Sequence, residues 1–232
     1  MINIPNTTIL AIDNTHRIQN TIKAIYTSIS EINFSKIKLI TTKENIDKYY
    51  LDNPKIEFEE MVYDISDINT YSKYMIYELH NHVNTEFVIN IQDHGFIVNP
   101  SMWTDEFLEY DYVGAPWSWS ENSYLTPYGE HIRVGNGGVS LRSKKLLEVP
   151  LKVNITFDCT TGDFYKHFNA NNFAEDGNIC VHNRHLFIEQ GCKFAPVELA
   201  AKFSYESSVP ENQNIIPFAF HYRLPAGIEI HD

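Results

Sequence analysis

The stretch TTILAIDNTHRIQNTIKAIYTSISEINFSKIKLI, residues 7–40, decides the fold class. It opens with the apolar run TTILAI, which is typical of a buried strand. A second apolar run, KIKLI, lies at residues 36–40. Between them, five isoleucines have the spacing of one helix face: Ile18, Ile22, Ile25, Ile29 and Ile32. Strand, helix and strand in this order predict the start of a parallel α/β sheet with a right-handed crossover.

The turn after the first strand carries polar residues that suit the start of a helix. Asp13, Asn14 and Thr15 stand where a helix N-cap is expected. The turn lacks GxGxxG, so the dinucleotide-binding fingerprint is absent. Asp13 and Arg17 are candidates to contact a nucleotide, although a cap and a surface charge are simpler roles for them.

The composition predicts a single globular domain over residues 1–232, with 43% hydrophobic and 21% charged residues. A net charge of −12 argues against nucleic acid and anionic membrane surfaces as partners. No apolar run reaches the roughly 18 residues of a membrane span, and the N-terminus lacks the features of a signal peptide. We therefore expect a cytoplasmic protein. Cys159, Cys180 and Cys192 show no CxxC spacing and are predicted to be reduced core residues.

Residues 86–100, EFVINIQDHGFIVNP, form a short apolar strand followed by a polar turn. The strand ends on Asp93, His94 and Gly95. An open α/β sheet usually binds its ligand at the carboxyl ends of its strands. The alternative is an ordinary turn in which Asp and Gly have their usual roles.

Three further segments carry candidate functional residues. Residues 134–143, VGNGGVSLRS, hold three glycines within four positions, which lets the backbone approach a ligand closely; a tight turn is the simpler reading. Glu175 and Asp176 precede a helical pattern, either as carboxylates favoured by the helix dipole or as a general base. His221 ends an apolar run and is either a core histidine or a metal or phosphate ligand.

The order of these segments resembles a known family. The strand ending in QDHG is followed by YDYVGAPW at 110–117, GNGGVSLRS at 135–143, ED at 175–176, KFSYE at 202–206 and PFAFH at 217–221. Over residues 62–223 this pattern is similar to glycosyltransferase-like proteins often catalogued as a domain of unknown function. The resemblance implies a GT-A fold, a Rossmann-like domain with a mostly parallel sheet and helices on both faces. It also implies transfer of a sugar from a nucleotide-sugar donor to a hydroxyl of a glycan or another acceptor.

The resemblance also implies roles for individual residues. Asp93 corresponds to the aspartate of a DxD metal and nucleotide site, and His221 to a C-terminal histidine that helps to hold metal and diphosphate. Gly137 and Gly138 correspond to the loop that flanks the donor and acceptor sugars. The implied cofactor is a divalent ion, Mn²⁺ or Mg²⁺, because two phosphates that leave together need their charge neutralised.

The chain departs from the DxD pattern, since Gly95 stands where the second acid is expected. His94 is a substitute ligand to consider, but alternation along an extended chain would turn it away from Asp93. We therefore expect Asp93 and His221 to be the ligands. The missing acid also supports an inactive nucleotide-sugar-binding module. A metal-dependent phosphate-ester hydrolase is disfavoured because its denser ligand cluster is missing.

Asp176 or Glu175 corresponds to the general base of inverting enzymes in this family. Neighbouring side chains point about 100° apart on a helix, so only one can face the cleft while the other pairs elsewhere. Helix N–H groups lower a carboxylate's pKa, which predicts a base that is ionised at neutral pH. We expect Asp176 to be that base.

Overall fold

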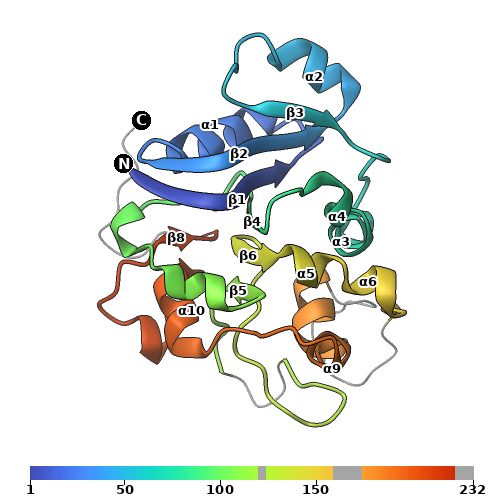
Figure 1. Cartoon of the computed structure of the whole chain (residues 1–232), viewed down its shortest axis with the longest axis vertical. Coiled ribbons are helices and arrows are strands. Elements are labelled where there is room, and N and C mark those ends of the chain that lie inside the picture. The colour runs from blue at the N-terminus through green and yellow to red at the C-terminus, as the bar shows by residue number, and fades with distance from the viewer. Residues whose placement is uncertain (120–123, 159–173, 223–232) are drawn as a thin grey trace.

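A computed structural model describes residues 1–119, 124–158 and 174–222. Its central sheet has six strands in the order β3-β2-β1-β4-β6-β5 (Figure 1). The strands are β1 Ile2–Ile12, β2 Ile32–Thr41, β3 Glu57–Glu60, β4 Phe87–Ile91, β5 Tyr112–Gly114 and β6 Ser140–Ser143. The pairs within β3-β2-β1-β4 are parallel, and β6 runs antiparallel to β4 and β5. The predicted mostly parallel α/β sheet is confirmed.

Helices connect and cover the strands. They are α1 Ile18–Ser28, α2 Lys43–Tyr49, α3 Ile68–Tyr77, α4 Leu79–His82, α5 Lys144–Leu147, α6 Val149–Lys152, α8 Glu175–Gly177, α9 Arg184–Glu189 and α10 Val197–Phe203. Short 3-10 turns occupy η1 Pro100–Met102, η2 Asp105–Glu109 and η4 Pro210–Asn212, and η3 Asn178–His182 is a π-helix. A second, parallel pair joins β7 Ser204–Tyr205 to β8 Ala219–Phe220.

Two apolar clusters lie on the two faces of the sheet because side chains alternate along each strand. Ile9 of β1 belongs to the cluster that includes α1 and α10, whereas Leu10 belongs to the cluster that includes α3, α5 and α9. All five residues of β4 are buried, as expected of a strand covered on both faces. Both faces of the sheet at β4 are therefore covered by other parts of the protein.

Several local predictions differ from the structure. Helix α1 ends at Ser28, and Ile32 instead begins β2, where it pairs with Ile2 of the long first strand. Asp13 to Thr15 do not cap α1, which begins at Ile18 without a side-chain cap. The sequence predicts a short helix over residues 143–149 that ends at Pro150. Pro150 stands instead in the first turn of α6, where a missing N–H breaks no helical bond.

Other predictions concern cysteines and membrane spans. Cys180 and Cys192 are buried and free, as predicted, while Cys159 lies outside the described residues. The sequence also predicts a short helix around residues 164–168, and these residues too lie outside the described ranges. Within the described ranges, no helix combines the length and apolar character needed to cross a membrane.

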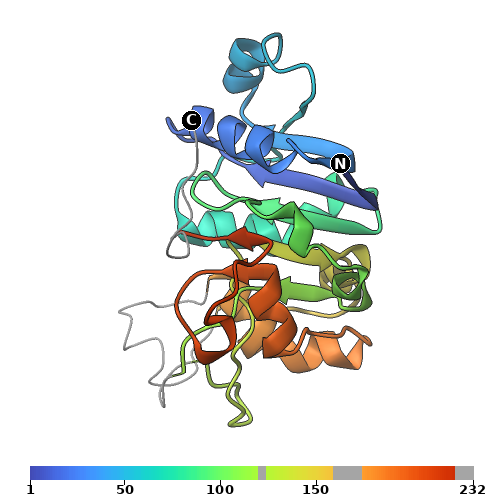
Figure 2. The same ribbon diagram turned by 90° about the vertical axis from the view of Figure 1, so that its left-hand side faces the viewer.

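The C-terminal segment returns to the carboxyl end of β4 (Figures 1 and 2). The amide of Phe220 donates to the carbonyl of Phe96 over 3.2 Å, and the amide of Tyr222 donates to the carbonyl of His94 over 2.8 Å. These bonds bring His221, which lies between the two donors, beside the turn that follows β4.

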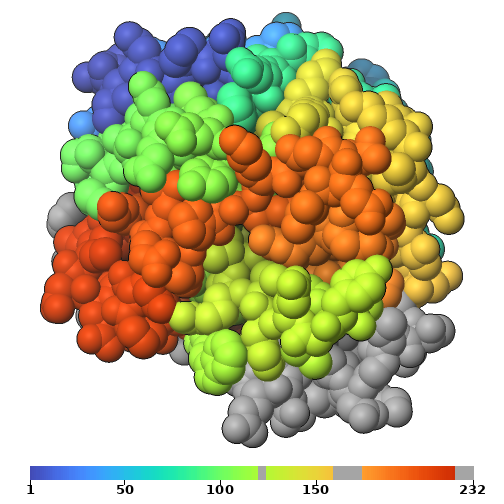
Figure 3. Space-filling model, turned by 60° about the horizontal axis from the view of Figure 1, so that its bottom comes forward, coloured from blue at the N-terminus to red at the C-terminus, as the bar shows by residue number. Residues whose placement is uncertain are grey.

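The segment around residues 128–133 contacts the C-terminal third of the chain. Figure 3 shows residues near 130, yellow-green, against the orange and red part of the chain. Arg133 makes a two-pronged ion pair with Glu211, at 2.5 and 2.9 Å. The Tyr128 ring lies edge-on to His185 at 5.0 Å between centroids. This segment leads into the glycine-rich loop at residues 135–138, and its contacts are with residues more than 50 positions later in the sequence.

Candidate functional site

The turn after β4, residues 92–95, is tight and leaves no room for a side chain at Gly95. Gln92 and Gly95 exchange backbone hydrogen bonds of 3.1 and 3.2 Å. A Cβ on Gly95 would lie 2.9 Å from Val139 and 3.0 Å from the carbonyl oxygen of Phe220. A side chain at this position, including the second acid expected in a DxD pattern, would therefore collide with the neighbouring segments.

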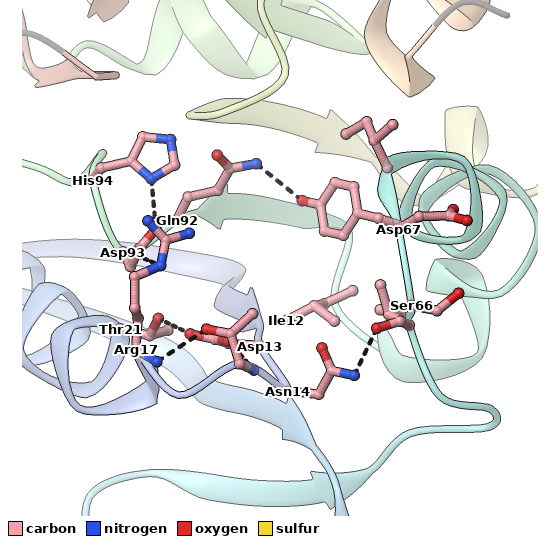
Figure 4. Close-up of a pocket in the computed structure, with 14 residues that line it drawn as sticks. Ile12, Asp13, Asn14, Arg17, Thr21, Ser66, Asp67, Gln92, Asp93 and His94 are labelled. Carbon is pink, nitrogen blue, oxygen red and sulfur yellow. Dashed lines mark hydrogen bonds and ion pairs between the residues drawn. The ribbon is translucent and has the colours of Figure 1, made fainter.

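Asp93 is held by two partners (Figure 4). Its Oδ2 accepts from the guanidinium of Arg17 at 3.2 Å, and its Oδ1 lies 2.5 Å from Nδ1 of His94. The expectation that His94 turns away from Asp93 is wrong. It assumed an extended chain, whereas residues 92–95 form a turn that brings the two side chains together.

His221 meets the turn through its ring. Its Nε2 lies 3.1 Å from Nε2 of His94 and 3.1 Å from Oε1 of Gln92. Its Nδ1 faces Oε1 of Glu206 at 3.4 Å. The same oxygen of Glu206 also accepts from the side-chain amide of Asn136 at 2.6 Å. His221 therefore links the end of β4 to the glycine-rich loop, and His94 rather than Asp93 is its partner.

The two glycines of the loop are needed for close packing. A Cβ on Gly138 would lie 2.0 to 2.4 Å from ring atoms of His221, and a Cβ on Gly137 would lie 2.2 Å from Oε1 of Glu175. Neither residue is among the described glycines with positive φ. Their role is thus to let the backbone approach the side chains of Glu175 and His221. The close approach of this loop to a ligand stays a prediction.

Asp176 lies directly against this loop. Its Oδ2 accepts from the Gly137 amide at 3.0 Å, and its Oδ1 accepts from the Gly177 amide at 2.7 Å. Burial and the charge of Glu175 outweigh these two bonds and raise the pKa of Asp176 to about 7. The expected lowering of this pKa is therefore wrong, because the helix start is enclosed by other segments.

Glu175 has a different partner. Its Oε1 accepts from the guanidinium of Arg142 at 2.9 Å, and both side chains are almost fully buried, with 0% and 5% exposed. The Arg142 guanidinium also lies over the ring of Tyr112 at 5.3 Å. Glu175 is thus engaged inside the protein, while Asp176 is half-buried beside the glycines.

Asp13 lies at the edge of a pocket of about 320 Å³ between the carboxyl ends of β1 and β4 (Figure 4). Both of its oxygens are occupied, by the Thr15 amide at 2.7 Å and the Thr21 hydroxyl at 2.5 Å. Asp13 therefore orders the loop that carries Arg17. Ile12, Ile65 and Ile68 give the pocket an apolar wall, and Arg17, Asp93 and His94 line it as well.

The predicted pairing of Asp93 with His221 around a metal is not the arrangement that the side chains adopt. Across residues 1–119, 124–158 and 174–222, no three His, Cys, Asp or Glu side chains form a group that could hold a metal ion. The atoms that do converge are the ring nitrogens of His94 and His221 and the amide oxygen of Gln92. Nitrogen and oxygen donors of this kind suit a divalent metal ion.

Three residues of the site were not predicted from the sequence: Gln92, Arg142 and Glu206. Each lies inside a quoted segment, QDHG, GNGGVSLRS or KFSYE. For Arg142, an available signal was a charged residue inside a predicted strand. Gln92 and Glu206 had no comparable local signal, because their partners come from distant segments.

The α/β fold is similar to that of solved glycosyltransferases. The galactosyltransferase LgtC, solved with donor and acceptor sugar analogues, is similar at a TM-score of 0.52 and 12% identity, over 95% of this chain and 88% of that one. An active-site mutant of LgtC gives 0.52 and 11% over the same shares. A mannosyltransferase from Pyrobaculum calidifontis, solved with GDP-Man and Mn²⁺, gives 0.45 and 12%, over 84% and 55%.

The chain belongs to the DUF5672 family, described as a protein of unknown function, whose model matches residues 54–221. This range agrees closely with the resemblance noted over residues 62–223. No protein of curated function matches the chain.

Proposed function

We propose that this protein is a glycosyltransferase that moves a sugar from a nucleotide-sugar donor to a hydroxyl of a glycan or another acceptor. We propose residues 1–232 as its single domain. One observation carries the proposal: a series of contacts runs from Arg17, Asp93 and His94 at the pocket, through His221, to the loop that touches Asp176. A ligand pocket and a carboxylate with a pKa near neutrality therefore share one edge of the sheet.

The pocket between β1 and β4 is the proposed donor site. Its volume of about 320 Å³ falls in the range of small-molecule sites. The apolar wall of Ile12, Ile65 and Ile68 suits a base or ribose, and Arg17 supplies a cation to the diphosphate. The Arg17 side chain is 51% exposed, so a ligand can reach it.

Asp176 is the proposed general base of an inverting transfer. The acceptor oxygen forms the new bond to the anomeric carbon, and its proton passes to the Asp176 carboxylate. The bond from that carbon to the diphosphate breaks, and its electron pair leaves with the nucleotide. A base whose pKa is about 7 is well matched to this task near neutral pH. Glu175 is excluded from the role because it is paired with Arg142.

We also propose that a divalent ion, Mn²⁺ or Mg²⁺, assists the reaction. When bound, such an ion stabilises the negative charge of the departing diphosphate. His94, His221 and Gln92 are the residues whose donor atoms face one another and would hold it. Asp93 then orients His94 and anchors Arg17, so its importance does not require direct contact with the ion.

The second candidate function is a nucleotide-sugar-binding module without transfer. The observation in its favour is the packing around Gly95, which excludes the second acid of a DxD pair. The two candidates share a donor site and differ only in turnover.

A thermal-shift screen of nucleotide sugars, with and without manganese, tests donor binding. A ligand at 100 times its Kd stabilises the folded state by about 2.7 kcal/mol. The donor identified in this way is then incubated with acceptor glycans, and the sugar product is measured. Transfer supports the first candidate, and tight binding without turnover supports the second. If no nucleotide sugar stabilises the protein in the screen, both candidate functions are wrong. If the transfer assay releases free nucleotide without a glycosylated acceptor, the protein hydrolyses the donor.

A further inference from the structure

The central strand β4 carries one polar side chain in its interior. The strand reads FVINI, and Asn90 is fully buried, with 0% of its surface exposed. Its Nδ2 donates to the carbonyl oxygen of Gly137 over 3.2 Å. Because a carbonyl only accepts, the NH₂ group of the amide must face Gly137, which fixes the orientation of the side chain. Since an apolar side chain, as at the other positions of β4, would be buried at lower cost, the amide indicates a role beyond packing.

Ser140 on the neighbouring strand β6 supplies a second donor to the same carbonyl. Its hydroxyl donates to the oxygen of Gly137 over 3.2 Å, and Nε of Arg142 donates to that hydroxyl over 3.1 Å. Since Arg142 can only donate, the hydrogen of the Ser140 hydroxyl is available to Gly137. Asn90 and Ser140 stand directly opposite each other in the antiparallel pair of β4 and β6, so their side chains lie on one face of the sheet. The two lone pairs of the Gly137 carbonyl thus each have a buried donor.

The other side of Gly137 is confined by packing. Its amide donates to Oδ2 of Asp176 over 3.0 Å. A Cβ on Gly137 would lie 2.2 Å from Oε1 of Glu175 and 3.0 Å from Cβ of Asp176, so the backbone cannot come closer to α8. The bonds from Asn90 and Ser140 oppose a movement in the other direction. The position of the Gly137 backbone is therefore set by side chains of β4 and β6.

We propose that Asn90 and Ser140 are positioning residues: they fix the backbone of Gly137, so that its amide holds the Asp176 carboxylate in one orientation. The described donors to Asp176 are the amides of Gly137 and Gly177, so both positioning residues act through Gly137. A reacting group that is misplaced by about 1 Å can lose about a hundredfold in rate, so this support matters for a base. The effect on catalysis rests on the proposed function, whereas the positioning of Asp176 does not.

Loss of the Gly137 bond should change the ionisation of Asp176 in a definite direction. A hydrogen bond from the Gly137 amide favours the ionised carboxylate and so lowers the pKa of Asp176. When Asn90 or Ser140 no longer holds Gly137, this bond weakens, and the pKa of Asp176 should rise above its value of about 7. The variants below retain the other ionisable groups that act on this carboxyl, which are Glu175, Glu206, Tyr112, Tyr124 and Cys180.

Nuclear magnetic resonance tests the inference without any sugar. The pair Asn136–Gly137 is the only Asn-Gly pair in the sequence, so full-length protein labelled with ¹³C-carbonyl Asn and ¹⁵N-Gly gives one selected amide signal, that of Gly137. This signal should shift with the ionisation of Asp176, with a midpoint near pH 7 in the wild type and no such shift in Asp176→Asn. Asn90→Leu, which keeps the size but removes the donor, should move the midpoint to higher pH. Ser140→Ala should move it in the same direction.

Asn53→Leu is the matched control. Asn53 is also buried and donates through Nδ2 to a backbone carbonyl, that of Tyr49, over 2.7 Å. The control should lose stability but keep the wild-type midpoint of the Gly137 signal. In the transfer assay, Asn90→Leu should lower kcat about ten- to a hundredfold and move the pH profile of kcat to higher pH. The KM for the donor should stay the same, because Asn90 does not line the pocket.

Three results overturn the proposal. The first is a wild-type Gly137 signal that does not follow the ionisation of Asp176. The second is an unchanged midpoint in the Asn90 and Ser140 variants, and if Asn90→Leu does not fold, Ser140→Ala decides alone. The third is an equal shift in Asn53→Leu, which would mean that any loss of stability moves the signal. The predicted midpoints in a protein that transfers no sugar would support the inference and contradict only the proposed function.

Discussion

The backbone amide of Gly137 donates to the carboxylate of Asp176 over 3.0 Å and so joins two segments that lie 39 positions apart in the chain. A Cβ on Gly137 would come within 2.2 Å of Oε1 of Glu175, so only glycine allows this approach. The contact places Asp176, in α8, against the same loop that packs against His221.

Asp176→Asn should reduce sugar transfer at least about a hundredfold, the usual effect of removing a general base, because the amide keeps the shape but takes no proton. Donor affinity should change little, since the pocket lies at the other end of the contact series. Single-turnover transfer and donor titration by calorimetry measure the two effects. Asp105→Asn, in the 3-10 turn η2, is the control. If the Asp176 variant transfers sugar at the wild-type rate, Asp176 is not the general base.

The rate of transfer should depend on pH through the same carboxylate. Because the pKa of Asp176 is about 7, the base is protonated below neutrality, and the rate should fall about tenfold for each pH unit below that value. The pH profile of kcat for wild-type protein with saturating donor tests this expectation. A profile that stays flat from pH 5 to 8 would contradict it.

Stability should show the opposite dependence on pH. The folded pKa of about 7 exceeds the ordinary value of 3.8, so the contribution of Asp176 to stability is present below pH 4 and is lost as pH rises through 7. Asp176→Asn has no such loss. The Tm of the variant relative to the wild type should therefore be several degrees more favourable at pH 8 than at pH 5. Equal differences at both pH values would show that the carboxyl is not perturbed.

The buried pair of Arg142 and Glu175 predicts a strong effect of single substitutions. Arg142→Met should lower the free energy of unfolding by about 3 to 5 kcal/mol, because it leaves a buried carboxylate without its partner. The double variant with Glu175→Gln should recover much of this loss. Urea denaturation measures both. As a control, Lys43→Met in the exposed pair with Asp47 should change stability by less than about 1 kcal/mol. Additive single effects would indicate that the two charges are not coupled.

Gly138→Ala should displace the His221 ring, because the new methyl would overlap its atoms at about 2.0 Å. We expect transfer and Mn²⁺ binding to fall together. Gly129→Ala is the matched control, since nothing lies within 4 Å of its Cβ. Its φ of +84° predicts a modest loss of stability, about 1 kcal/mol, with transfer unchanged. A Gly138 variant that retains both activities would show that His221 is not confined there.

The order of elements at the start of the chain was determined by the sequence itself. Residues 7–40 carry their own periodicity, and periodicity depends only on which side chains follow one another. The strand end at Asp93, the close-packed glycines and the helix start at Glu175 are local in the same sense. The glycine-rich loop before β6 lies at the same edge of the sheet as Asp93 because β6 runs antiparallel to β4, and the predicted parallel order did not require this.

The chemistry of those residues was decided only by the tertiary structure. His94 faces His221 because the residues on either side of His221 form backbone hydrogen bonds with His94 and Phe96. No sequence pattern near His94 predicts that the C-terminal segment returns to this place. The pKa of Asp176 rises because segments from elsewhere in the chain enclose the helix start, where the local N–H groups alone would lower it. Burial and electrostatic fields add contributions from every segment that packs nearby, so they are properties of the assembled protein and not of any one stretch.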